Sequence, residues 1–294
     1  MPDIEGLLGA DEKNVRQMQR LFASYKGLPE LLNEASVLYT TCSRAFGQTL
    51  GHEINSLPRG TPPDKHIIAG LLAKRHCALL FTRIGVLYAT AVADLLRMRL
   101  TAPLGYLRLQ CESIALLKLM SENSSVIEQW VNIQTDKEGR AFFRKHQERV
   151  MAILNTYNLS DIYDQTSGST LHSRFIGVAR GYKFARYKDG SCVVDSDKIL
   201  AQEFDPEKPH YFMIVVIFTV LRAQALIFAN LHDSIPDIND PLLLETRFSQ
   251  FIERVNQFMD RVVNTFHNIY QIILNRDSLK HRLLKMLLCS FFLF

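Results

Sequence analysis

Apolar residues recur every three or four positions along most of the chain, which is the spacing of amphipathic helices. Loops that contain proline and glycine or several aspartates interrupt this spacing at 56–64 and 232–241. The pattern predicts helices at 11–25, 28–50, 64–99, 103–121, 124–134, 137–157, 168–179, 208–232, 241–275 and 277–290. We therefore expect an all-α protein, built as an antiparallel helical bundle.

One stretch departs from helical spacing. The dipeptide Asp189-Gly190 lies between two runs rich in β-forming residues, and Asp-Gly is typical of tight hairpin turns. A small β-hairpin is therefore expected as an insertion in the bundle. We see no internal repeat or clear linker, so we expect a single domain over 1–294, made of N-terminal helices (1–60), a core (64–180), the hairpin (181–196) and C-terminal helices (208–294).

Composition adds weak constraints. Apolar residues make up 47% of the chain and charged residues 22%, which is ordinary for a globular protein. The net charge of +4 permits an anionic partner without requiring one. Five scattered cysteines without a Cys-x-x-Cys pair are typical of a cytoplasmic protein with reduced thiols. We expect no metal site and no cofactor, because no Cys/His cluster has ligand spacing.

Two long apolar runs, 77–96 and 211–231, resemble membrane spans in composition. They contain Arg83 and Arg222 respectively, and an arginine at the bilayer centre costs about 2.5–3.5 kcal/mol on insertion scales. We therefore interpret both runs as buried helices and expect no transmembrane segment.

The stretch YLRLQCESIALLKLM, residues 106–120, carries Arg108 and Glu112 among leucines. In helical projection both charges fall in an apolar arc of about 80°. Three interpretations stay open: a buried structural ion pair, a functional pair, or a surface pair worth about 0.2–0.5 kcal/mol.

Arg83 and Arg222 are also single arginines within apolar helices. If they meet Arg108 inside the bundle, Glu112 and Asp94 are too few carboxylates to neutralise them. A surplus of guanidinium groups favours a phosphate or carboxylate ligand, which arginine binds through paired hydrogen bonds.

The segment 161–190 carries further candidates. We expect Ser167 or Ser169 to cap a helix N-terminus, which would place His172 in the first turn and favour its neutral form. Basic residues then alternate with aromatic ones, a pattern that suits RNA phosphates and stacked bases; the alternative is a hairpin with its aromatic residues packed inward. The basic candidates for binding are Arg174, Arg180, Lys183 and Arg186.

Together, LRLQCESIALLKLM and IYDQTSGSTLHSR resemble an uncharacterised bacterial family of helical proteins. Its members carry an arginine and a glutamate one turn apart, followed by a Tyr…Ser…His segment. That family is similar to the HEPN-like domains, many of which bind or cut RNA in toxin and phage-defence systems. The resemblance implies a HEPN-like core and marks five positions: Arg108, Glu112, Tyr163, Ser169 and His172.

HEPN ribonucleases use an Arg-x(4–6)-His motif, and four pairs in this chain fit it. Chance alone gives about two such matches in a chain with this many arginines and histidines. On a straight helix, Arg140 and His146 would point to opposite sides. We select none of the four pairs, which are Arg59/His66, Arg140/His146, Arg261/His267 and Arg276/His281.

These observations predict a site for RNA or a nucleotide. If the protein cleaves RNA without a metal, His172 would be the base, Arg108 would stabilise the phosphate and Glu112 would orient Arg108. Whether it is an enzyme stays open.

The alternative is a non-catalytic interaction protein that forms a homodimer or binds a partner through its C-terminal helix. The apolar end of 275–294 must dock against the bundle, a second copy, another protein or a membrane surface.

Overall fold

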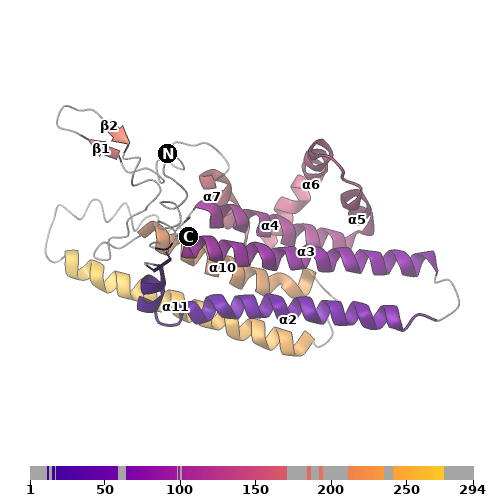
Figure 1. Cartoon of the computed structure of the whole chain (residues 1–294), viewed down its shortest axis with the longest axis horizontal. Helices are drawn as coiled ribbons and strands as arrows, with labels where there is room; N and C mark the ends of the chain where they lie inside the picture. Colours follow the sequence, from indigo (N-terminus) through magenta and orange to yellow (C-terminus); the bar gives the residue numbers. More distant parts are fainter. Residues whose placement is uncertain are drawn as a thin grey trace. The chain divides into compact units, whose positions relative to one another are not determined.

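The computed structural model describes residues 12, 15, 16, 18–58, 64–97, 99, 101–170, 184–186, 192–194, 211–234 and 241–274. Nearly all of these residues are helical, which confirms the all-α bundle (Figure 1). The helices are α2 (Leu28–Asn55), α3 (Lys65–Leu96), α4 (Thr101–Glu122), α5 (Ser124–Val131), α6 (Asp136–Thr156), α7 (Ser160–Thr170), α10 (Tyr211–Ser234) and α11 (Pro241–Leu274).

The chain divides into two compact units, Met1–Ile252 and Glu253–Phe294. The first contains α2 to α10 and the beginning of α11, and the second contains the rest of α11. The single domain expected over 1–294 stays a prediction.

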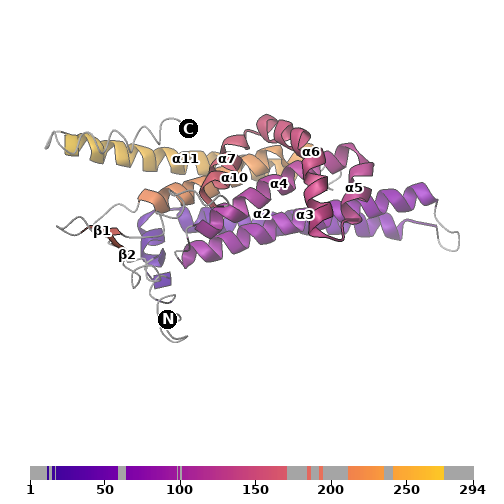
Figure 2. The same cartoon turned by 90° about the horizontal axis from the view of Figure 1, so that it is seen from above.

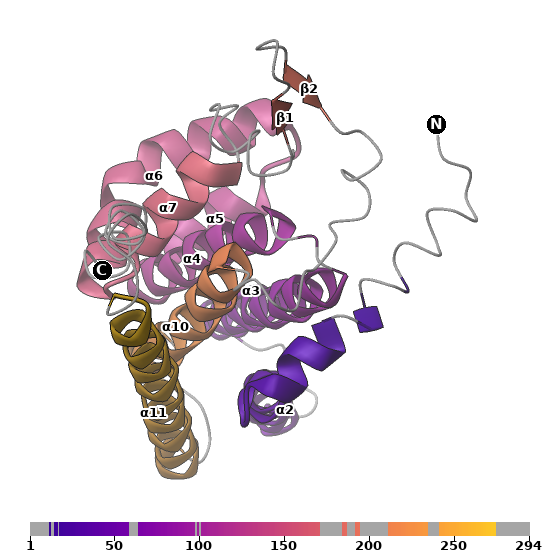
Figure 3. The ribbon, with the colours of Figure 1, turned by 90° about the vertical axis from the view of Figure 1, so that its left-hand side faces the viewer.

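Helix α4 is the centre of the first unit. It contacts α3, α5, α6, α7 and α10, and the end-on view in Figure 3 shows it between α3, α7 and α10. Figure 2 shows α2, α3 and α4 running alongside one another. Because α4 is covered on several sides, side chains on different faces of it are fully buried, among them Leu107, Leu117 and Leu119.

A chain of buried hydrogen bonds crosses this core. The Tyr39 hydroxyl donates to Gln224 Oε1 at 2.6 Å, and Gln224 Nε2 donates to Gln110 Oε1 at 3.1 Å. Gln110 Nε2 in turn donates to the Ile84 carbonyl at 2.8 Å. Both glutamines are fully buried. Their hydrogen bonds offset the free-energy cost of removing the two amide groups from water. We call this chain the glutamine ladder; it joins α2, α10, α4 and α3.

Helix α3 approaches α2 closely beside the ladder. A Cβ atom placed on Gly85 would lie 3.1 Å from Tyr39 Cβ, which is closer than ordinary van der Waals contact. Glycine at this position lets the two backbones pack against each other.

Helix α3 is also apolar enough over Ile67–Leu96, by length and composition alone, to cross a membrane. It is the one such helix among the described residues. Its buried face includes Leu80, Phe81, Ile84 and Tyr88.

The helix ends largely follow local signals. Asn123 caps α5 by accepting from the Ser125 amide. Thr135 and Glu138 form a capping box at the start of α6. Helix α2 begins after Gly27, whose φ of 95° favours glycine.

Helix α7 corrects the prediction of a helix at 168–179 capped by Ser167 or Ser169. It begins at Ser160, so both serines lie within the helix and neither caps its N-terminus. Leu159, Ile162 and Thr166 are buried at helical spacing, and α7 packs on α4. The intervening aspartates and serines, which are weak helix formers, obscure this spacing in the sequence. Residues 171–179 lie outside the described part of the chain.

Two short strands, β1 (Phe184–Arg186) and β2 (Cys192–Val194), pair antiparallel with Ala185 opposite Val193. Each has three residues, and the residues on either side of them are not described. A hairpin insertion over 181–196 therefore stays a prediction.

Candidate anion-binding groove

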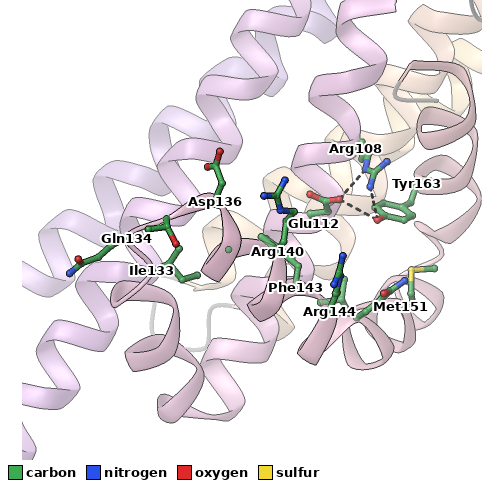
Figure 4. Close-up of a pocket in the computed structure, with 14 residues that line it drawn as sticks. Arg108, Glu112, Ile133, Gln134, Asp136, Arg140, Phe143, Arg144, Met151 and Tyr163 are labelled. Atoms are coloured by element: carbon green, nitrogen blue, oxygen red, sulfur yellow. Dashed lines mark hydrogen bonds and ion pairs between the residues drawn. The ribbon is translucent and has the colours of Figure 1, made fainter. Parts of the chain in front are cut away.

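A pocket of about 750 Å³ lies in the first unit, between α4, α6, α7 and the segment that leads into α6. Figure 4 shows it with α6 along one side and Arg108, Glu112 and Tyr163 on the other. We call this pocket the arginine groove. Its lining is Arg108, Glu112, Ile133, Gln134, Thr135, Asp136, Gly139, Arg140, Phe143, Arg144, Gln147, Val150, Met151 and Tyr163.

Arg108, Glu112 and Tyr163 form a closed triangle of hydrogen bonds. Arg108 Nε donates to Glu112 Oε1 at 3.0 Å, and Arg108 Nη2 donates to the Tyr163 hydroxyl at 3.3 Å. That hydroxyl donates to the same Glu112 oxygen at 3.2 Å. The guanidinium carbon also lies 5.0 Å from the centre of the Tyr163 ring, within cation–π range. Arg108 is therefore held in one position by two side chains.

The ion pair is neither sealed nor at the open surface. The side chains of Arg108 and Glu112 are 22% and 19% exposed, while Leu104, Ala115 and Leu119 on the same face of α4 are buried. The apolar face predicted for this helix is thus present, and the two charges lie where it opens into the groove.

Tyr163 stays protonated at neutral pH. Burial raises the pKa of its hydroxyl, the Glu112 carboxylate raises it further, and Arg108 partly opposes both. The hydroxyl can therefore act as the donor that the triangle requires.

Arg140 and Arg144 bring two more positive charges to the groove. They lie one turn apart on α6, both are exposed, and Figure 4 shows their side chains on the side of α6 where Glu112 and Tyr163 lie. No carboxylate among the described residues pairs with either at the 4.0 Å limit of a salt bridge. Sequence reasoning missed Arg144; the signal was its spacing of four from Arg140 on a helix.

Three backbone amides at the start of α6 are already engaged by side chains. The amides of Gln134 and Thr135 both donate to Glu138 Oε2, at 2.8 and 3.0 Å. The Glu138 amide donates to Thr135 Oγ1, and these backbone bonds lower the pKa of the Glu138 carboxyl. These three amides are therefore not free to bind a ligand in the groove, and the cations that it offers are its arginine side chains.

The rest of the lining mixes polar residues with apolar ones. Phe143 is 39% exposed and its ring meets Phe142 edge to face. Val150 and Met151 lie further along α6. The groove thus offers both cations and an apolar surface, and its volume is within the range of small-molecule sites.

The predicted partners of Arg108 lie elsewhere. Arg83 is exposed on α3 and Arg222 is half-buried on α10, and neither appears among the described residues that line the groove. Asp94 lies 3.6 Å from Arg99 and 4.0 Å from Arg97. The structure brings Arg140 and Arg144 to Arg108 in place of the two arginines predicted from the apolar helices.

The remaining predicted site residues lie outside what the structure describes. His172, Arg174, Arg180 and Lys183 are in undescribed segments, and Ser169 and Arg186 are described only in their backbone. Their roles stay predictions.

In the Arg140/His146 pair, His146 is buried, whereas Arg140 is exposed. It packs on Phe142, and its Nε2 lies 3.4 Å from Gln129 Oε1. The two residues of this motif therefore occupy different environments on α6. Of the other three pairs, each has at least one residue outside the described side chains.

Cys42, Cys77 and Cys111 carry free thiols. Burial raises their pKa to about 12, about 11 and about 12 respectively, so they are protonated and poorly nucleophilic at neutral pH. No group of three or more His, Cys, Asp or Glu in the described part of the chain could hold a metal ion.

No protein-family model, curated protein or solved structure matches this chain. The HEPN-like resemblance therefore stays a prediction, and function has to be inferred from the groove.

Proposed function

We propose that this protein binds a phosphate-bearing ligand, RNA or a nucleotide, in the arginine groove. One observation carries the proposal: Arg140 and Arg144 line the groove beside Arg108 without a carboxylate partner among the described residues. Arginine is the residue that best matches phosphate, through paired N–H donors.

The balance of charge supports an anion. Three arginines and two carboxylates, Glu112 and Asp136, line the groove, which leaves one positive charge in excess. Glu112 already accepts from both Arg108 and Tyr163. It therefore serves to hold Arg108 and does not neutralise Arg140 or Arg144.

Phe143 supports a ligand that carries a base. Its partly exposed ring lies one residue before Arg144 and three after Arg140 on the groove side of α6. A base stacked on an aromatic ring contributes about 1–3 kcal/mol. The basic segment 174–186 would extend the contact to neighbouring phosphates of an RNA.

Binding is better supported than cleavage. Metal-free cleavage of RNA needs a base, and no histidine is among the described residues that line the groove. Tyr163 is a poor base at neutral pH because its pKa is raised. His172 remains the proposed base if the protein is an enzyme. A role in defence or as a toxin rests on the resemblance alone, and a cytoplasmic location on the scattered cysteines.

The test is binding of a short fluorescein-labelled single-stranded RNA, followed by fluorescence anisotropy. Arg140→Gln and Arg144→Gln should each weaken binding about tenfold, the loss of one charge-assisted contact. Each should also lower the slope of log K against log salt by about 0.7, the value for one phosphate contact.

Lys137→Gln is the matched control. Lys137 is exposed on the same helix and does not line the groove. Lys137→Gln therefore changes the net charge by the same amount as either arginine variant. If Lys137→Gln weakens binding as much as the arginine variants do, the RNA is held by general charge and the groove is not its site.

The alternative, a dimer or partner interface formed by 275–294, concerns residues outside the described part of the chain and stays a prediction.

A further inference from the structure

A second face of α3 is apolar and open. Ile68, Leu72, Leu79 and Val86 are between 41% and 58% exposed. At 100° per residue they fall within an arc of about 40°, and they extend for about 27 Å along the helix axis. We call these four residues the α3 stripe.

The stripe is separate from the core of the bundle. Leu80, Phe81, Ile84 and Tyr88 are buried, and in the same projection they centre on the opposite side of α3. Surface helices usually carry polar residues on the side that faces away from the core. The presence of two apolar faces also explains why α3 is apolar enough in composition to resemble a membrane span.

Basic residues flank the stripe. Arg75 and Arg83 are exposed and project within about 40° of its two edges. The one acidic residue of α3 is Asp94, which is buried near the end of the helix. The open face of α3 thus combines aliphatic side chains with positive charge alone.

We propose that the α3 stripe binds an amphipathic helix of another protein that carries acidic residues beside its apolar seam. Leu72, Leu79 and Val86 follow one another at intervals of seven, which supplies one of the two seam positions that packed helices use in each heptad. Glutamate or aspartate opposite Arg75 and Arg83 would complement the charges that flank it.

A second copy of this chain does not fit the stripe. Arg75 and Arg83 are four residues either side of Leu79. An antiparallel pair of stripes centred on Leu79 would place each Arg75 opposite the other copy's Arg83. A parallel pair would place each arginine opposite itself, and like charges in such positions are destabilising.

A membrane surface fits less well than a helix. A helix that lies in the bilayer interface needs a broad apolar face, whereas the stripe is about 40° wide and the opposite side of α3 is packed in the bundle. A narrow seam is what a single partner helix covers.

The test uses the full chain and a synthetic helical peptide with leucine at heptad spacing and glutamate at the flanking positions, followed by fluorescence anisotropy. The wild-type protein should bind it, and the double variant Arg75→Glu/Arg83→Glu should bind at least tenfold more weakly. The same variant should gain affinity for a peptide in which lysine replaces the glutamates.

Two further variants separate the stripe from general charge. Leu79→Ala should also weaken binding of the glutamate peptide, because it shortens the apolar seam at an exposed position. Arg20→Glu/Arg44→Glu reverses two exposed charges elsewhere and should leave binding within about twofold of wild type. Circular dichroism checks that each variant is folded.

Three results would overturn the proposal. They are no binding of the glutamate peptide by the wild type, equal binding by Arg75→Glu/Arg83→Glu, and binding of anionic phosphatidylglycerol vesicles in place of the peptide. None of them bears on the arginine groove, because Arg75 and Arg83 do not line it.

Discussion

At the scale of single residues, Arg108 shows how a charge is accommodated in an apolar helix face. Glu112 compensates its charge, and Tyr163 accepts a further guanidinium hydrogen bond. The Tyr163 hydroxyl then donates to Glu112, so its proton also has an acceptor. Because each member is bonded to the other two, the triangle sets the direction in which Arg108 faces the groove.

Replacing Tyr163 by phenylalanine removes the hydroxyl and keeps the ring. We expect a loss of about 1 kcal/mol in the free energy of unfolding, because two hydrogen bonds at a half-exposed site are lost. RNA affinity should fall several-fold, since Arg108 becomes free to turn. Urea unfolding and anisotropy measure the two effects, and an unchanged affinity would show that Tyr163 does not position Arg108 for the ligand.

The sequence was sufficient to predict the apolar face around Arg108 and Glu112, because helical spacing is a local property. It also singled out Tyr163, through the family resemblance. The meeting of α4 with α6 depends on tertiary packing, so Arg144 could not be placed beside Arg108. The same limit applies to Arg83 and Arg222, which were expected beside Arg108 and are not among the described residues that line the groove. An arginine within an apolar run indicates where the packed face of its own helix ends, but not which other helix packs there.

At the scale of elements, α6 presents two different faces. One carries Arg140 and Arg144 into the groove, and the other buries Phe142 and His146. Burial lowers the pKa of His146, and the neighbouring Lys145 and Arg149 lower it further. The neutral imidazole is therefore the form that the folded helix favours.

This makes stability depend on pH. As the pH falls below the ordinary histidine pKa of 6.5, the unfolded chain takes up a proton that the folded His146 resists, so the free energy of unfolding decreases. His146→Gln cannot be protonated, and we expect its melting temperature to fall less than that of wild type between about pH 7.5 and about pH 5.5. Parallel losses in both proteins would mean that other groups control this range.

At the scale of the whole molecule, the glutamine ladder connects parts of the sequence that lie far apart, with Tyr39 and Gln224 separated by 185 positions. It joins Tyr39, Gln110 and Gln224. The other contacts of these helices are largely apolar, and apolar contacts alone tolerate sliding of one helix along another. Directional bonds between buried amides fix the alignment of α4 and α10.

Gln224→Leu tests this ladder at its centre. It leaves both the Tyr39 hydroxyl and Gln110 Oε1 without their partners in a dry core, and we expect a loss of about 3 kcal/mol or more in the free energy of unfolding. Tyr39→Phe removes one end and leaves a single acceptor unpaired, so it should cost about half as much. Urea unfolding distinguishes the two, and equal costs would indicate that water or a rotated amide replaces the lost bonds.

The ladder also limits how this protein can diverge. Changing one glutamine alone leaves its neighbours with unpaired buried polar atoms, which lowers the free energy of unfolding. Replacing all the bonded side chains by apolar ones of similar shape lowers it little. Among proteins that descend from a common ancestor with this chain, positions 39, 110 and 224 are therefore expected to change together or to stay as they are. Such a correlated trio would let distant relatives be recognised when their overall sequences have drifted apart.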